Sequence, residues 1–398
     1  MTPDWDMRVL ANVDVHASKA ATYVHIPFCS AVCPYCDFAV VAGADDRIDR
    51  YIDAVVAEIE LSDPWRVLDA VYFGGGTPSH VRPHLLGRIL AVLRAHHGIA
   101  NEAEISLEAN PEDFSEERAD ELLGAGFNRV SFGVQSFDDV VLARLGRRHR
   151  AVDIVSSVDK ARRAGFTNVS VDLIFGTPEE SEKSWASSLQ GAIDLRPDHV
   201  SCYALTVEPG TPLQRDVRAG AAAPDPDVQA DRYELAERLL PMAGLERYEV
   251  SNWARPGQEC RYNLVVWAQG EYEAYGNGAH RFLNRVRSHN VRRLDAYMDR
   301  VESGLRPIAG ADPIEGWDVE IDRLFVGLRR SAGVGTGPGV ESLIETSGGQ
   351  MLLREGIIEV AGGRLMVRRP LLTDEVHRQV LDLDPPQGWV ESTNPDNL

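Results

Sequence analysis

Three of the chain's five cysteines, Cys29, Cys33 and Cys36, fall within one short stretch. The CxxxCxxC spacing places three thiolates on one loop, which is enough to hold three corners of an iron–sulfur cube. A structural zinc site normally takes four ligands, so His25 or a remote cysteine would have to close it. A cube with three cysteines instead leaves one iron open to a small chelating ligand. The spacing alone leaves both kinds of site open.

The remaining two cysteines are expected to be structural thiols. Cys202 lies in an apolar run and Cys260 lies in a loop. Five cysteines in 398 residues are few and odd in number, which argues against a disulfide framework.

The composition is that of an ordinary globular protein, with 44% hydrophobic and 26% charged residues. A formal net charge of −20 argues against nucleic acid as the main partner, because phosphate selects clustered Lys and Arg. The first twenty residues carry Asp4, Asp6 and Asp14, and no apolar run approaches the roughly 20 residues that span a bilayer. We therefore expect a cytoplasmic protein.

The elements that must position the cysteines form a repeating pattern of strand and helix. Six β-branched runs, at 22–26, 68–73, 103–108, 128–134, 168–175 and 198–205, alternate with amphipathic stretches that often begin at Ser or Asp and end at Gly. Such alternation implies parallel strands with right-handed crossovers, in either a doubly wound sheet or an incomplete barrel.

The unusual residues decide between these two architectures. The cysteine loop follows the first run, Gly74–Thr77 the second, Glu108 ends the third, Gln135 follows the fourth and Asp172 lies in the fifth. In a barrel the loops after successive strands converge on one rim. We therefore predict an α/β fold with an incomplete (β/α)6 barrel of the TIM type.

The barrel is expected to occupy only part of the chain. We predict a tail at 1–21, the barrel at 22–241, an aromatic and Gly-rich connecting segment with a candidate haem site at 242–313, a C-terminal domain at 314–385 and a tail at 386–398. The C-terminal domain should be smaller, mainly helical and winged-helix-like, with a hairpin across "EVAGGRLMV".

A set of short sequence motifs then indicates a protein family. They are "YVHIPFC", "CPYCDF", "YFGGGTPS", "EANPEDF", "NRVSFGVQSFDD", "LGRRH", "VSVDLIFGTP", "YEVSNWARPG" and "LFVGLR". Together they resemble the radical S-adenosylmethionine (SAM) superfamily. Within it they resemble the HemN/HemW family of oxygen-independent coproporphyrinogen III oxidases and haem chaperones. The match runs from Tyr23 to about residue 335.

The resemblance implies a [4Fe-4S] cluster on the three cysteines, with SAM chelating the open iron through its amino and carboxylate groups. It implies SAM contacts from Tyr23, Gly75, Gly76, Thr77, Glu108, Gln135, Arg147 and Asp172. Taken one at a time, these residues also allow structural explanations that do not involve SAM. The glycines suit either close backbone approach or a tight turn. Asp172 interrupts an apolar strand and needs a partner, either a ribose hydroxyl or a protein donor. Arg147 could meet the SAM carboxylate or end a helix in solvent.

Two differences from the oxidases indicate to which branch of the family the chain is more similar. The oxidases carry a further cysteine two residues after the third, where this chain has Phe38, and they extend further upstream of the first strand. Both departures favour the chaperone branch, which binds haem and delivers it to acceptor proteins. The alternatives are a coproporphyrinogen III oxidase, which would decarboxylate propionates, and a zinc-stabilised interaction protein. Peripheral membrane association and a dimer are compatible with the resemblance.

A third departure concerns the haem ligand. The chaperone branch has an HNxxYW signature, which here reads "YNLVVW", with Tyr262 in place of the histidine. A tyrosinate can ligate ferric haem if a cation such as Arg261 lowers its pKa. If Tyr262 only packs, either His280 or His289 would have to hold the iron or the haem affinity is lost. The densest cationic stretch comprises Arg281, Arg285, Arg287, Arg292 and Arg293, which could pair with propionates or be solvated.

Overall fold

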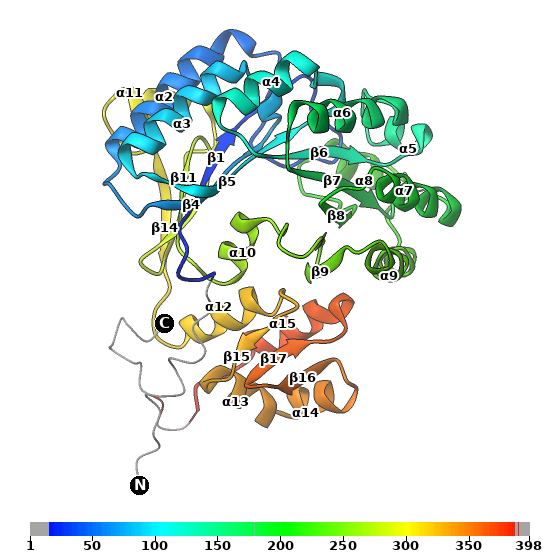
Figure 1. The fold of residues 1–398 in the computed structure, drawn as a ribbon. Helices are drawn as coiled ribbons and strands as arrows, with labels where there is room; N and C mark the ends of the chain where they lie inside the picture. Colours follow the sequence, from blue (N-terminus) through cyan, green and yellow to red (C-terminus); the bar gives the residue numbers. More distant parts are fainter. Residues whose placement is uncertain (1–15, 179, 387–388, 390–398) are drawn as a thin grey trace.

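A computed structural model describes residues 16–178, 180–386 and 389. Its largest sheet has twelve strands in this part of the chain, in the order β14-β13-β12-β11-β1-β4-β5-β6-β7-β8-β10-β9 (Figure 1). The six predicted strands are confirmed as β1 (Ala21–Ile26), β4 (Leu68–Gly75), β5 (Ile99–Ala109), β6 (Arg129–Gln135), β7 (Asn168–Phe175) and β8 (His199–Ala204). These six strands run parallel to one another, as the alternation with helices predicts.

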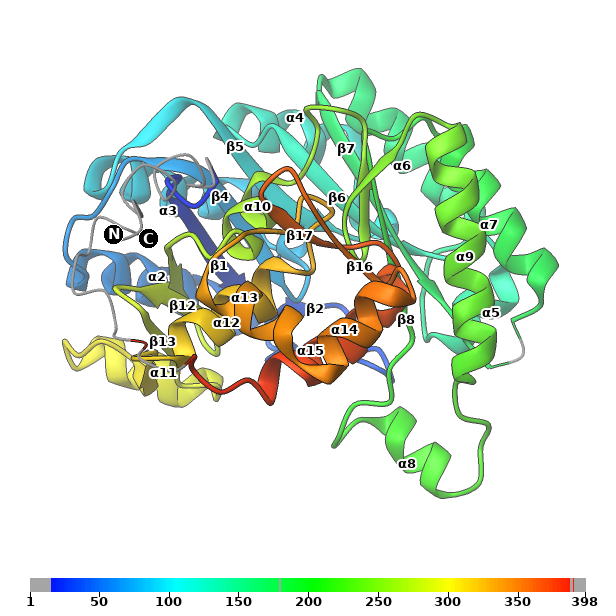
Figure 2. The same cartoon turned by 90° about the horizontal axis from the view of Figure 1, so that it is seen from below.

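Helices follow these strands and, except for the short helix at Pro212–Arg218, lie along the outside of the curved sheet (Figures 1 and 2). They are α2 (Ile48–Leu61), α3 (Pro83–His96), α4 (Glu116–Ala125), α5 (Asp139–Arg144), α6 (Ala151–Ala164), α7 (Glu182–Asp194), α8 (Pro212–Arg218) and α9 (Pro226–Met242). Ser115 and Ser181 accept hydrogen bonds from the first turns of α4 and α7. Gly126 and Gly165 end α4 and α6 with φ angles of 108° and 117°, which favour glycine.

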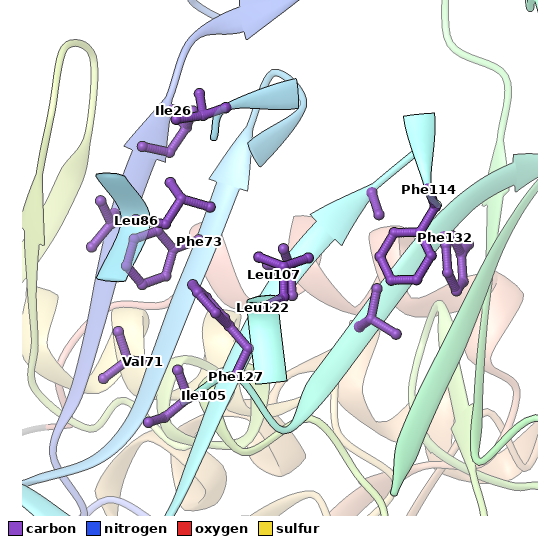
Figure 3. Packing of buried hydrophobic residues seen from close by; sticks show 14 of the residues in the cluster. Ile26, Val71, Phe73, Leu86, Ile105, Leu107, Phe114, Leu122, Phe127 and Phe132 are labelled. Carbon is purple, nitrogen blue, oxygen red and sulfur yellow. The ribbon is translucent and has the colours of Figure 1, made fainter. Parts of the chain in front are cut away.

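The two faces of the sheet differ in chemistry. Successive side chains alternate between the faces. One set, including Val71, Phe73 and Leu107, packs against helix residues such as Leu86 and Leu122 in the main apolar core (Figure 3). The opposite face carries polar and aromatic side chains that lie side by side through the strand register: Tyr23, Tyr72, Ser106, Arg129, Ser131, Ser170, Asp172 and Ser201. The barrel therefore has a polar interior beneath its rim.

The segment 242–313, expected as a connector, contributes strands to both edges of this sheet. β9 (Glu246–Glu249) and β10 (Asn252–Ala254) continue beyond β8 in antiparallel pairing. β11 (Tyr272–Tyr275) pairs parallel with β1, and three antiparallel strands follow it: β12 (His280–Leu283), β13 (Val286–Asn290) and β14 (Ile308–Pro313). The helices α10 (Arg261–Trp267) and α11 (Leu294–Glu302) complete the segment.

The C-terminal unit lies below the open side of the sheet, with α10 between them (Figures 1 and 2). It contains α12 (Asp318–Gly327), β15 (Val334–Gly335), α13 (Pro338–Glu345), α14 (Ser347–Arg354), β16 (Ile358–Ala361), β17 (Arg364–Val367) and α15 (Thr373–Leu381). The hairpin predicted across "EVAGGRLMV" is confirmed as β16–β17. Asp322 joins the unit to the barrel by accepting hydrogen bonds from Arg287 and Gln269. None of the described helices is long and apolar enough to cross a membrane.

A buried carboxylate ties β11–β13 to the helical layer. The Glu58 side chain on α2 is fully buried and accepts hydrogen bonds from Gly276 N at 2.8 Å, Asn290 Nδ2 at 2.7 Å and the Tyr297 hydroxyl at 2.7 Å. The Arg281 guanidinium lies 3.6 Å away and is also buried. Since these partners come from β12, β13, α11 and the turn after β11, one carboxylate joins four segments.

We predict that Glu58→Ala lowers the free energy of unfolding by about 3–5 kcal/mol, because it leaves buried donors without their acceptor and removes one of the two carboxylates beside the buried Arg281 guanidinium. Asp295→Ala is the matched control, since Asp295 pairs with Arg47 at 2.8 Å between side chains that are 52% and 44% exposed. That pair should be worth less than about 1 kcal/mol. Urea titration followed by circular dichroism measures both variants, and equal destabilisation would contradict the role given to Glu58.

Candidate functional site

The cysteine loop begins where β1 ends. Cys29 closes the short strand β2 (Phe28–Cys29), which pairs with β3 (Val41–Ala42), so the loop leaves from and returns to one small ladder. Within it, the Cys36 amide donates to the Cys33 carbonyl at 3.1 Å. His25 supports the loop from β1, with Nε2 3.0 Å from the Ala39 carbonyl oxygen. All three cysteines are partly exposed.

The Gly-rich turn after β4 packs directly against the start of this loop. The Gly76 amide donates to the Ile26 carbonyl at 2.8 Å, and the Thr77 amide donates to the Phe28 carbonyl at 2.9 Å. A Cβ atom at Gly76 would lie only 2.8 Å from the Pro27 carbonyl carbon. Gly75 has a φ of 111°, and a Cβ there would lie 2.3 Å from the His25 ring. Packing within the protein therefore already requires these glycines.

Arg147 points into the site and not into solvent. Its Nη1 donates to Cys33 Sγ at 3.4 Å, while Nη2 donates to Asn110 Oδ1 at 2.5 Å and to the Gly133 carbonyl at 3.0 Å. Its Nε is buried and has no hydrogen-bond partner among the described residues. The guanidinium thus places a fixed positive charge beside the sulfurs and keeps one donor unused.

The sulfurs themselves are held in a partly dry environment. Burial raises the pKa of the Cys29 thiol to about 11, and the Thr77 hydroxyl, 3.6 Å from Cys29 Sγ, acts in the opposite direction. Burial likewise raises the pKa of Cys36. Since thiolates are the metal-binding form, ligation at these positions must release protons.

The donor set fits an iron–sulfur cluster better than zinc. Zinc holds its sulfur ligands about 2.3 Å from one ion, so they must converge on a single point. In the part of the chain that the structure describes, no three His, Cys, Asp or Glu side chains converge in this way. His25, the nearby candidate for a fourth ligand, has both ring nitrogens occupied, by the Tyr23 hydroxyl at 3.1 Å and by the Ala39 carbonyl. A cube spreads three thiolates over three irons and needs no such convergence.

Two carboxylates lie on the polar interior face next to the Gly-rich turn. Glu108 accepts hydrogen bonds from the Tyr72 hydroxyl and the Gly75 amide, both at 3.0 Å. Burial, together with the charge of Asp172, raises the pKa of Glu108 to about 7. Asp172 accepts from the Ser131 hydroxyl at 3.0 Å, and burial also raises its pKa. The protein partners of Asp172 are therefore the hydroxyls of Ser131 and Ser201, neither an arginine nor a backbone amide.

Gln135 ends β6 in a conformation that a non-glycine residue rarely adopts. Its φ is 66°, in the left-handed region, and a Cβ atom at Gly133 would lie 2.9 Å from its Nε2. Strained backbone of this kind gathers at functional sites. The structure thus brings Gln135, Arg147, Glu108, Asp172 and the Gly-rich turn to one rim.

Tyr262 packs inside the barrel in a group of tyrosines. Its ring centroid lies 5.4 Å from Tyr72 and 5.9 Å from both Tyr23 and Tyr272. Burial raises the pKa of Tyr262 well above its ordinary value. Arg261, the expected activating cation, donates instead to the carbonyl of Glu102. This environment disfavours a phenolate and favours packing over iron ligation.

The basic stretch from 281 to 293 does not form one patch. Arg281 is buried, with Nη1 3.2 Å from Glu273, and Arg287 is held by Asp322. Arg292 and Arg293 are exposed. The expectation of a cationic cluster is therefore wrong for Arg281 and Arg287, because acidic partners distant in the sequence bind them.

Two polar residues of the site did not stand out in the sequence. Asn110 links Arg147 to the Thr77 hydroxyl, to which its Nδ2 donates at 3.1 Å. Arg129 is buried under the carboxylates and donates to Ser106 Oγ at 2.9 Å. The available signal was a charged residue within an apolar strand, in phase with the polar Ser131.

Comparisons with known proteins agree with this arrangement. Residues 23–190 match the family model of the Radical SAM superfamily. The chain is 41% identical over 323 residues to "Heme chaperone HemW" of Mycobacterium tuberculosis (strain ATCC 25618 / H37Rv), covering 78% of this chain and 82% of that protein. It is 37% identical over 336 residues to the protein of the same name from Synechocystis sp., with 81% of each covered.

A solved structure matches nearly the whole chain. Coproporphyrinogen III oxidase (HemN) from Escherichia coli, described as a radical SAM enzyme, superposes with a TM-score of 0.79 over 94% of this chain and 92% of that one, at 22% identity. This likeness confirms the expected fold, an incomplete barrel with a smaller C-terminal unit. With the sequence identities to the HemW proteins, it shows that the chain belongs to the HemN/HemW family of the radical SAM superfamily.

Proposed function

We propose that this protein is a cytoplasmic haem chaperone, which binds haem, hands it to acceptor proteins, and carries a [4Fe-4S] cluster and SAM. The observation that carries the proposal is the identity to proteins named heme chaperones over about four fifths of both chains. Phe38 supports the same choice. It occupies the position of the additional oxidase cysteine, and its side chain is 63% exposed beside the cysteine loop.

The residues at the rim suit the two cofactors. Cys29, Cys33 and Cys36 would hold the cluster, which when bound supplies the electron for reductive cleavage of SAM. The buried, unpartnered Nε of Arg147 suits a carboxylate, the strong acceptor for which a guanidinium is shaped. Glu108 would accept from the SAM amino group, since it already receives the Gly75 amide on the same side.

The remaining rim residues would orient the nucleoside part of SAM. Asp172 has two hydroxyl donors, Ser131 and Ser201, and a carboxylate has about four lone-pair sites, so it can also accept a hydrogen bond from a ribose hydroxyl. Gln135 lies at the same rim on strained backbone, and Tyr23 lies on the inner face below it. These contacts assign to this chain's residues the tasks of binding and orientation.

Arg147→Lys should retain about four irons per chain after reconstitution and weaken SAM binding at least about tenfold. A lysine lacks the planar guanidinium, whose several N–H groups can donate to Cys33, Asn110 and a SAM carboxylate at the same time. Arg148→Lys, a change at the exposed neighbour, is the control and should bind SAM normally. Equilibrium dialysis with labelled SAM measures both variants, and unchanged affinity in Arg147→Lys would remove this contact.

The pKa of Glu108 predicts a pH dependence of SAM binding. Because it is raised to about 7, the carboxylate is mostly protonated below that pH and mostly charged above it. The ratio of SAM affinities, wild type over Glu108→Gln, should therefore rise as the pH increases through about 7 and then level off. Using a ratio cancels the titration of the SAM amino group. A ratio that stays constant between about pH 6 and 8.5 would contradict the contact.

Haem delivery is tested on anaerobically reconstituted protein. Titration with haem should give a saturable Soret band at one haem per chain, and mixing with apomyoglobin as a model acceptor should move the haem to it. Absence of saturable binding would overturn the proposal. Conversion of coproporphyrinogen III to protoporphyrinogen IX in the presence of SAM and a reductant would favour the oxidase instead.

A further inference from the structure

An exposed pair of histidines lies on the hairpin formed by β12 and β13. His280 and His289 are direct partners in the antiparallel register, and their rings stack with centroids 5.2 Å apart and planes 24° apart. His280 is exposed and His289 is partly exposed. Within the described ranges, the ring nitrogens of this pair make no hydrogen bonds. Four buried histidines differ from this pair, since both ring nitrogens are hydrogen-bonded in His25, His97, His149 and His199.

His280 is suited to bind a metal centre through its neutral imidazole. Burial, together with His289 and the charge of Arg292, lowers the pKa of His280 below its ordinary value. Near neutral pH this ring therefore carries a free nitrogen lone pair, which is what haem iron requires of an imidazole. The nearly parallel stacking leaves no room for a porphyrin plane between the rings, so only one of the two can be an axial ligand.

The hairpin abuts the cysteine loop. Asn277, three residues before His280, donates through Nδ2 to the Ala39 carbonyl at 3.4 Å and to the Arg292 carbonyl at 2.9 Å. A Cβ atom at Gly278 would lie 3.0 Å from that of Ala39, and the Arg292 guanidinium donates to the Asp37 carbonyl. Phe38, between these two contact points, exposes 63% of its surface.

Haem needs an iron ligand, an apolar contact for its flat face and cations for its propionates. The hairpin and the loop offer these three in one neighbourhood. The ligand is His280 and the aromatic contact is Phe38. The cations are Arg292 and Arg293, both exposed, and the Arg293 guanidinium has no ion pair in the part of the chain that the structure describes.

We infer that His280 is the axial ligand of a haem site at the edge of the cysteine loop, that His289 positions its ring, and that Arg292 and Arg293 face the propionates. This inference rests on the proposed function and deepens it, because it places the haem away from Tyr262. The cargo would then be held on the same side of the molecule as the cluster loop.

Haem titration of four variants tests the site. His280→Ala should lower haem affinity at least about tenfold and shift the Soret band, and added imidazole should restore the band position. His289→Ala should have a smaller effect in the same direction. His84→Ala, which removes an exposed histidine at the start of α3, and Tyr262→Phe should behave as wild type. The iron and sulfide content of each variant shows that the loop is intact.

The outcomes separate this inference from the proposed function. Saturable binding by wild type together with an unchanged spectrum and affinity in His280→Ala overturns the haem site but not the chaperone proposal. A loss confined to Tyr262→Phe also overturns the site. Absence of haem binding by wild type overturns the proposed function itself, before any variant is compared.

Discussion

The close packing of the cysteine loop against the Gly-rich turn is the constraint on which the site depends. Gly76 and Thr77 donate backbone hydrogen bonds to Ile26 and Phe28, and no side chain fits at Gly76 because the Pro27 carbonyl occupies the space. This contact fixes the ends of β1 and β4 at one level. Cys29 therefore starts the loop beside Thr77, and Arg147 reaches Cys33 from the segment between α5 and α6.

The difference between the two faces of the sheet allows polar side chains to gather at this rim. The main apolar core lies between the outer face and the helices that cover it, and its burial stabilises the fold. The polar face of the sheet stays free to carry Glu108 and Asp172 at low solvent exposure, where their pKa values are raised. A third buried carboxylate, Glu58 on α2, holds β11–β13 in place. Its hydrogen bonds anchor to α2 the hairpin that carries His280 and His289. The cluster loop and the hairpin with the histidine pair thus lie on segments that contact one another.

Much of this could be predicted from sequence where the signal is local. The six parallel strands follow from β-branched runs, and the ends of α4 and α6 follow from Gly126 and Gly165. Strands such as β10 and β11 have only three or four residues, and their pairing with β8 and β1 depends on contacts distant in sequence. The prediction of a cationic cluster from the run of arginines failed for the same reason, since it too depended on contacts distant in sequence. Glu273 and Asp322 bind Arg281 and Arg287, and local sequence cannot indicate such partners.

The central claim is that the cargo and the cluster share one side of the molecule. Electron paramagnetic resonance on protein with a reduced cluster and one equivalent of bound ferrous haem tests this most directly, because a five-coordinate ferrous haem is paramagnetic and speeds the relaxation of a nearby cluster signal. The account predicts faster relaxation with ferrous haem than with its diamagnetic zinc analogue. Identical relaxation with both would contradict it, since the haem would then lie far from the cysteine loop.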